Sequence, residues 1–259
     1  MEYEHLRCEC DGEQVTITLD RPERRNCLST EVLRELDHAL RSTGGQDDVA
    51  GIVLAATGSV FSAGHDLAEM ARMDEDELRV LFETCTSAMT ALSDVPQVVV
   101  AQVQGLATAA GAQLAASCDL IVASEAAGFS TPGGKGGLFC HTPMVAVARQ
   151  VGRKRAVELA FTGGEIDATT ALDWGLVNRV VPAAELEAAT RAFLGYATRG
   201  SRHAKGLGKQ TLYAQLDLPV GDAYELAVDV MARAAAKGDG AEWPRAFVEK
   251  RPPEWTHTE

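Results

Sequence analysis

Two short stretches decide the predicted fold of this 259-residue chain, FSAGHDL at residues 61–67 and QGLATAAGAQL at residues 104–114. Each follows a run typical of a buried strand and precedes a helical pattern. Their small side chains let a ligand approach the backbone closely. Backbone N–H groups at a helix start have no partner within the helix and favour negative charge. Two such groups that converge on one oxygen would form an oxyanion hole, in which each donor is worth about 3 kcal/mol in a transition state.

Strand and helix patterns alternate around these two stretches. Apolar runs at 15–19, 51–55, 97–101 and 119–123 predict strands, and this alternation indicates an α/β core. From about residue 140 helical patterns dominate, interrupted by a predicted strand at 176–181. Further helices are predicted at 29–45 (capped by Ser29 and closed by Gly44 and Gly45), 78–92, 143–151, 154–161, 168–174, 184–198, 208–216 and 222–236. We predict a core over residues 1–195 and a helical C-terminal subdomain for oligomerisation over 196–259.

The charge balance and the cysteines exclude several classes of protein. The chain has 24 Lys and Arg against 37 Asp and Glu, a net charge of −13. Nucleic acids and anionic membranes would repel such a chain, so neither is expected as a partner. The six cysteines form no CxxC pair, and no His pair has metal-ligand spacing, so no metal is expected. Without a signal peptide pattern we predict a cytoplasmic protein with free thiols.

Several motifs, in their order and spacing, resemble the crotonase superfamily, the enoyl-CoA hydratase/isomerase family. The stretch RPERRNCL at 21–28 is similar to the family's Arg-Pro-x-x-x-Asn-Ala-Leu motif, called the entry motif below. Residues 61–67 are similar to the family's Phe-x-Ala-Gly-x-Asp loop. Residues 105–113 match its glycine-rich helix start, and FSTP at 129–132 its Phe-x-x-Pro. The stretch GLFCHTP at 137–143 is similar to the third subgroup of enoyl-CoA hydratase domain-containing proteins. The resemblance implies a spiral of ββα turns with a helical C-terminal part, assembled as a trimer or a dimer of trimers.

The resemblance also implies an acyl-CoA thioester as the substrate, with no further cofactor. The thioester oxygen would accept hydrogen bonds from the backbone N–H groups of His65 and Ala110, which would stabilise an enolate. Alternatively, Arg24 and Arg25 lie in a solvated turn and do not contact the CoA phosphates. Asp66 is also suited to cap the helix that follows it. The residues expected at the CoA part, the last two from a neighbouring subunit, are Arg24, Arg25, Cys27, Ala63, Gly64, Asp66, Leu67, Phe247 and Lys250.

The chain departs from the hydratase pattern at both positions where hydratases carry a glutamate. Gln113 stands at the first position, and its amide cannot exchange a proton. Gly133 stands at the second and has no side chain. Water addition to an enoyl thioester needs groups that titrate, so standard hydration is expected to be very slow or absent.

Three residues of the expected acyl pocket are candidates to replace the glutamates. Some decarboxylases of the family carry the same SAGHD string, in which the histidine holds a carboxylate or protonates the enolate, so His65 is the first candidate. Alternatively His65 acts only through its N–H, Cys140 is a structural thiol and His141 a loop residue. Three functions therefore stay open: an enzyme of the hydratase/isomerase type, a decarboxylase of malonyl-type CoA that uses His65, and a non-catalytic acyl-CoA binder.

Overall fold

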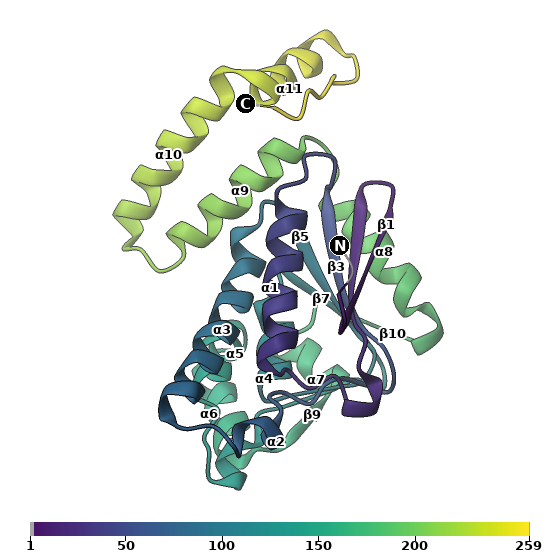
Figure 1. The fold of residues 1–259 in the computed structure, drawn as a ribbon. Coiled ribbons are helices and arrows are strands. Elements are labelled where there is room, and N and C mark those ends of the chain that lie inside the picture. The colour runs from purple at the N-terminus through teal and green to yellow at the C-terminus, as the bar shows by residue number, and fades with distance from the viewer. Residues whose placement is uncertain (1–2, 259) are drawn as a thin grey trace.

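The computed structural model describes residues 3–258, which form two sheets with helices packed around them (Figure 1). The larger sheet has six strands, and all neighbours pair in parallel except β1 and β2. Its order is β1 (Leu6–Asp11), β2 (Gln14–Leu19), β3 (Gly51–Ala56), β5 (Val98–Val103), β7 (Leu120–Ser124) and β10 (Arg179–Val181). The smaller sheet has the order β4 (Val60–Ser62), β6 (Leu106–Thr108), β8 (Gly128–Ser130) and β9 (Glu165–Asp167). The predicted α/β class is confirmed.

Helices cover both faces of the larger sheet. One face packs against α1 (Thr30–Gly44), α3 (Glu75–Asp94) and α4 (Ala110–Ser117), where the main apolar core lies. The opposite face packs against α8 (Leu186–Ala197). Strands buried on both faces lack alternation and read as continuous apolar runs, which is why β3 and β5 were predictable. As predicted, Ser29 caps α1 by accepting a hydrogen bond from the N–H of Val32.

The smaller sheet and the shorter helices surround the predicted site. These helices are α2 (Leu67–Met70), α5 (His141–Val151), α6 (Arg153–Thr162) and α7 (Ala168–Asp173). Turns of 3₁₀ helix lie at Pro22–Arg24, Pro132–Gly136 and Ala183–Glu185. The sequence did not predict β1 or any strand of the smaller sheet. Five of the six residues of β1 are exposed, and the smaller sheet has strands of three residues, so neither produces a periodic pattern.

Three helices form a C-terminal arm, namely α9 (Arg202–Gln215), α10 (Val220–Ala236) and α11 (Gly238–Glu249), which lies at one end of the molecule (Figure 1). The buried ammonium of Lys209 on α9 joins this arm to the core. It lies 2.8 Å from a carboxylate oxygen of Asp119, and it donates to the carbonyls of Leu92 and Gln97. The sequence did not predict α11, since Gly238 and Pro244 are poor helix formers. The proposed boundary at residue 195 stays a prediction.

Candidate functional site

The entry motif at residues 21–28 holds the first loop in place. The side chain of Asn26 is buried; it donates to the carbonyls of Thr57 and Val60 and accepts from the N–H of Arg21. The Ala63 N–H donates to the carbonyl of Arg25. The Leu28 N–H donates to the carbonyl of Gly64 at 2.8 Å. The motif therefore fixes the backbone of residues 63–65 from one side.

The second loop meets the first at Gly64. A methyl group on Gly64 would lie 3.0 Å from the backbone nitrogen of Ala110 and 3.0 Å from the carbonyl oxygen of Thr108. Gly64 also has a φ of +81°, which favours glycine. A side chain at this position would be strained and would push the two loops apart. The structure thus places Gly64 of the first loop beside the backbone of Thr108 and Ala110 of the second.

Ala110 is the first residue of α4, so its N–H has no acceptor within the helix. The preceding Ala109 has φ +52° and ψ −119°, a conformation rare for a residue with a side chain. Such backbone strain costs about 1–3 kcal/mol. The Ala109 N–H donates to the carbonyl of Ser130 at 2.9 Å, which helps to hold this turn. The strained turn aims the start of α4 toward the first loop.

A cavity of about 480 Å³ opens beside this junction, a size suited to a small-molecule ligand. Seven of the predicted site residues line it: Ala63, His65, Leu67, Ala110, Gly133, Cys140 and His141. None of the residues described as lining it carries a carboxylate, and most are apolar. The cavity can therefore hold an acyl chain, and its titratable side chains are two histidines and one cysteine.

His65 of the first loop lines this cavity, and its ring lies between the Leu28 carbonyl and Phe82. Its Nδ1 lies 3.3 Å from the carbonyl oxygen of Leu28, and the ring packs edge-on against Phe82 of α3, with centroids 5.4 Å apart. Nε2 is buried and has no hydrogen-bond partner within residues 3–258. Burial lowers the pKa of His65 below its usual value, although the Leu28 carbonyl and Glu69 oppose this. His65 is therefore a neutral ring near pH 7.

The turn that contains Gly133 leaves no room for a side chain there. A methyl group on Gly133 would lie 2.1 Å from the carbonyl oxygen of Leu138 and 2.8 Å from the sulfur of Cys140. The Gly133 N–H donates to that sulfur at 3.3 Å, and the Gly133 carbonyl accepts from the N–H of Leu138. Burial raises the pKa of the Cys140 thiol, and the N–H of Gly133 opposes this. The chain itself fills the space in which the second glutamate would begin.

Gln113 follows Ala110 by one turn of α4 and is buried, with 5% of its surface exposed. Its Oε1 is buried without a hydrogen-bond partner in the described part of the chain. The side chain is not among the residues that line the cavity. At the position where the resemblance implies the first glutamate, the structure thus has an amide whose oxygen is buried without a partner among residues 3–258.

Asp66 caps α2, as expected, by accepting from the N–H groups of Ala68 and Glu69. Arg24 forms an ion pair with it at 2.8 Å, and the thiol of Cys27 lies 3.5 Å away. Burial opposes ionisation of Asp66, but these hydrogen bonds outweigh it and lower its pKa. Both Arg24 and Arg25 are exposed in the turn that carries them, outside the cavity lining.

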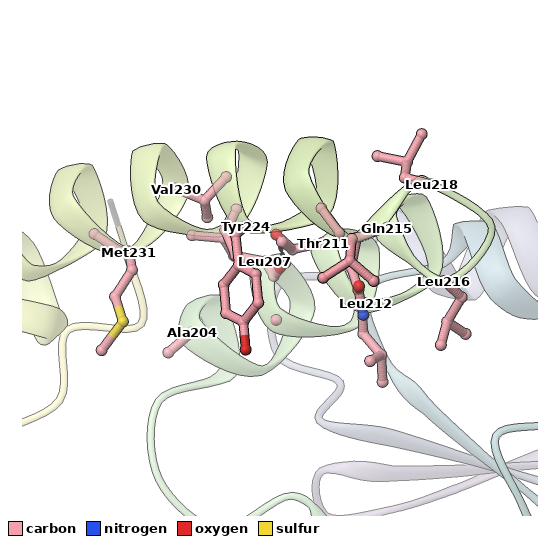
Figure 2. Close-up of a pocket in the computed structure, with 15 residues that line it drawn as sticks. Ala204, Leu207, Thr211, Leu212, Gln215, Leu216, Leu218, Tyr224, Val230 and Met231 are labelled. Carbon is pink, nitrogen blue, oxygen red and sulfur yellow. Dashed lines mark hydrogen bonds between the residues drawn. The ribbon is translucent and has the colours of Figure 1, made fainter.

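Phe247 and Lys250 lie at the far end of the molecule from the cavity. They belong to the end of α11, whereas α2 lies at the opposite end (Figure 1). Within one chain the structure does not bring them to the site. A groove of about 690 Å³ also lies in the C-terminal arm, between α9 and α10, and is lined by apolar side chains such as Leu212, Tyr224 and Met231 (Figure 2).

Several cavity residues were not predicted from the sequence. Phe82 and Met70 come from helices whose apolar residues look alike whether they face the core or a cavity. The others belong to the two loops and the Gly133 turn, where closeness to predicted residues was the only signal. They are Thr108, Ala109, Pro132, Gly136, Leu138, Phe139, Thr142 and Pro143.

Comparison with known proteins gives consistent matches. Residues 12–258 match the family model described as enoyl-CoA hydratase/isomerase. Enoyl-CoA hydratase domain-containing protein 3, mitochondrial, is 42% identical in Xenopus laevis and 43% in Homo sapiens, over 93% of this chain and 83% and 80% of those proteins. A crystal structure of enoyl-CoA hydratase from Mycobacterium smegmatis superposes with a TM-score of 0.94 and 41% identity, over 98% of this chain and 99% of that one. The predicted superfamily, subgroup and fold are confirmed.

One prediction is wrong by the same comparison. We expected a cytoplasmic protein, but the relatives from Xenopus laevis and Homo sapiens are named as mitochondrial. Cysteine usage reports the redox state of a compartment, and this signal cannot separate one reducing compartment from another. In the described residues, no helix combines the length and apolar character needed to cross a membrane.

Proposed function

This chain belongs to the enoyl-CoA hydratase/isomerase family, and we propose that it binds an acyl-CoA thioester and stabilises its enolate between the backbone N–H groups of His65 and Ala110. The close approach of Gly64 to the Ala110 nitrogen supports this proposal, because it places the two loops side by side at the edge of an apolar cavity. Two preorganised donors aimed at one oxygen stabilise the charge that develops when a thioester becomes an enolate.

Hydration of an enoyl thioester is not the reaction we propose. Gly133 has no space for a side chain, and the amide of Gln113 cannot transfer a proton. A reaction that proceeds through the enolate alone remains open to this cavity. Isomerisation needs one base, and decarboxylation of a malonyl-type thioester needs no base at the α-carbon.

The proposal is tested by binding and turnover measured on the same preparation. We expect butyryl-CoA to bind, and crotonyl-CoA to be hydrated no faster than about 1% of the rate of a family member that carries both glutamates. Turnover of methylmalonyl-CoA would favour the decarboxylase. Binding of acyl-CoA without any exchange or turnover would favour the non-catalytic binder, and failure to bind any CoA ester would overturn the proposal.

A single substitution removes one proposed donor. Ala110 is the first residue of α4, where proline is tolerated because it lacks only an N–H that the helix does not use. Ala110→Pro should lower any enolate-forming activity by about 100-fold or more. Ala110→Gly keeps the N–H and is the control for packing. Thermal unfolding of both variants separates loss of the donor from loss of the fold.

We also propose self-association through the C-terminal arm. Tyr224, Met231 and Phe247 expose large apolar surfaces there, each more than 70% accessible. Burial of such surface against another copy of the chain would be favourable, and only a neighbouring copy could bring Phe247 and Lys250 to a CoA site. Light scattering after gel filtration should give a trimer or hexamer, which the double substitution Tyr224→Lys, Met231→Glu should dissociate.

A further inference from the structure

Two walls of different kinds enclose the cavity of about 480 Å³. One is helical and includes Phe82 of α3, whose neighbours Leu81 and Cys85 are buried in the core. The other includes the turn at residues 134–138, which is exposed, and a methyl group on Gly136 would meet nothing within 4 Å. A wall that is part of a close-packed core resists displacement. The α3 wall is therefore the fixed boundary of the cavity.

Phe82 also borders a second hollow, of about 390 Å³, on the outer face of α3. Side chains one helical turn apart line this outer hollow, namely Glu75, Leu78, Arg79, Phe82, Glu83 and Thr86. Phe82 is the one described residue that lines both spaces. Its ring packs edge-on against that of His65, with centroids 5.4 Å apart, and it also contacts the main core. The Phe82 ring thus separates the cavity from the outer hollow.

The two spaces differ in chemistry. Among the described residues that line the cavity, none carries a carboxylate, an ammonium or a guanidinium group. Burial lowers the pKa of His65 and raises that of the Cys140 thiol, so both side chains are neutral near pH 7. The outer hollow, in contrast, is lined by three exposed charged residues, Glu75, Arg79 and Glu83. A hydrocarbon chain therefore gains free energy on the inner side of Phe82, whereas a charged group there would lose its hydration without a counter-charge.

We propose that Phe82 sets the longest acyl chain that the cavity accepts, and that the substrate is the thioester of an uncharged hydrocarbon acyl chain that ends at the Phe82 ring. A longer chain would have to displace this ring, which His65 and the core hold in place. Phe82 is thus a residue that determines specificity. This inference rests on the proposed function and adds to it the class and the length limit of the acyl group.

The test is the affinity of the protein for straight-chain acyl-CoA esters from butyryl-CoA to palmitoyl-CoA, measured by calorimetry below their micelle concentrations. In the native protein the affinity should rise about 4-fold for each methylene and then fall beyond a limiting length. Phe82→Ala joins the two spaces and should move the limit to chains at least about two carbons longer. Phe82→Trp has a larger side chain and should move the limit to shorter chains.

The opposite shifts distinguish a length limit from a loss of packing, which would weaken the binding of all chains alike. Leu78→Ala is the matched control, because Leu78 lines the outer hollow and not the cavity, and it should keep the native limit. Thermal unfolding of each variant shows whether it is folded. If Phe82→Ala does not fold, Phe82→Leu keeps an apolar side chain of smaller size and should move the limit in the same direction.

A second comparison tests the class of acyl group. Glutaryl-CoA and valeryl-CoA have acyl groups of equal length, but that of glutaryl-CoA ends in a carboxylate. We expect glutaryl-CoA to bind at least about 10-fold more weakly to the native protein. Equal or tighter binding of glutaryl-CoA would overturn the assigned class.

The remaining outcomes separate this inference from the proposed function. The same limiting length in the native protein, Phe82→Trp and the folded smaller variant would overturn the inference and leave the proposed function intact. An affinity of the native protein that rises without a limit up to palmitoyl-CoA would do the same. Failure of the native protein to bind any acyl-CoA ester would overturn both.

Discussion

The two positions that lack a glutamate, 113 and 133, differ in what replaces the carboxylate. At position 113 a buried amide takes its place, and Oε1 finds no partner within residues 3–258. At position 133 the side chain is gone, and the Leu138 carbonyl and the Cys140 sulfur occupy its volume. Position 113 thus keeps a polar side chain on α4, whereas the turn around position 133 leaves no room for a side chain.

This difference indicates that restoring the two carboxylates would have unequal consequences. A carboxylate fits the volume at 113 but would be buried without a visible counter-charge. A carboxylate at 133 does not fit unless residues 133–140 refold. The lack of a side chain at position 133 is therefore a property of the local fold as well as of the sequence.

The largest expected effect is that of Gly133→Glu. The new side chain would start 2.1 Å from the Leu138 oxygen, so the free energy of unfolding should fall by about 3 kcal/mol. Gly136→Glu in the same turn is the matched control, because a methyl group there meets nothing within 4 Å, and its effect should stay within about 0.5 kcal/mol. Urea denaturation of both variants measures the difference, and equal stabilities would show that the turn is not closed around Gly133.

A smaller effect, which depends on pH, is expected for Gln113→Glu. Burial raises the pKa of a carboxyl group in the folded protein above its value of about 4.3 in the unfolded chain. The loss of stability should therefore be smaller at pH 4, where the group is mostly protonated in both states, and should grow to about 2 kcal/mol at pH 7. Gln113→Leu, which removes the unsatisfied oxygen, should change stability by less than about 1 kcal/mol. A loss for Gln113→Glu that is the same at both pH values would mean that position 113 is hydrated.

The smallest expected effect is an energetic coupling between Cys140 and Gly133. Cys140→Ala removes the acceptor of the Gly133 N–H and should cost about 1 kcal/mol. It also removes the sulfur 2.8 Å from a methyl group at 133, so Gly133→Ala should be about 0.5–1 kcal/mol less harmful in that background. Cys85→Ala, on α3, should show no such coupling to Gly133→Ala. Additive effects for Cys140 would contradict the packing at this turn.

The sequence predicted the elements with strong local patterns. The strands β3 and β5 appear as continuous apolar runs, and Ser29 and Asp66 are helix caps, as expected. The two loops were placed together because their motifs recur in a known family. Motif spacing also located positions 113 and 133, and the structure adds what fills them.

Other features depend on contacts that a single sequence does not encode locally. Nothing near His65 in the sequence indicates that its ring contacts the carbonyl of residue 28. The fold of the Gly133 turn onto Cys140 was likewise invisible, because four glycines permit many turns. The twelve residues of α11 gave no helical pattern, because Gly238, Gly240 and Pro244 have a weak preference for helix.

The central claim is that a thioester oxygen lies between the N–H groups of His65 and Ala110. The ¹³C chemical shift of the carbonyl of [1-¹³C]butyryl-CoA measures this most directly, because two hydrogen bonds polarise the carbonyl. We predict a downfield shift on binding to the native protein and a smaller one on binding to Ala110→Pro. A bound thioester whose carbonyl shift equals that of the free compound would contradict the account.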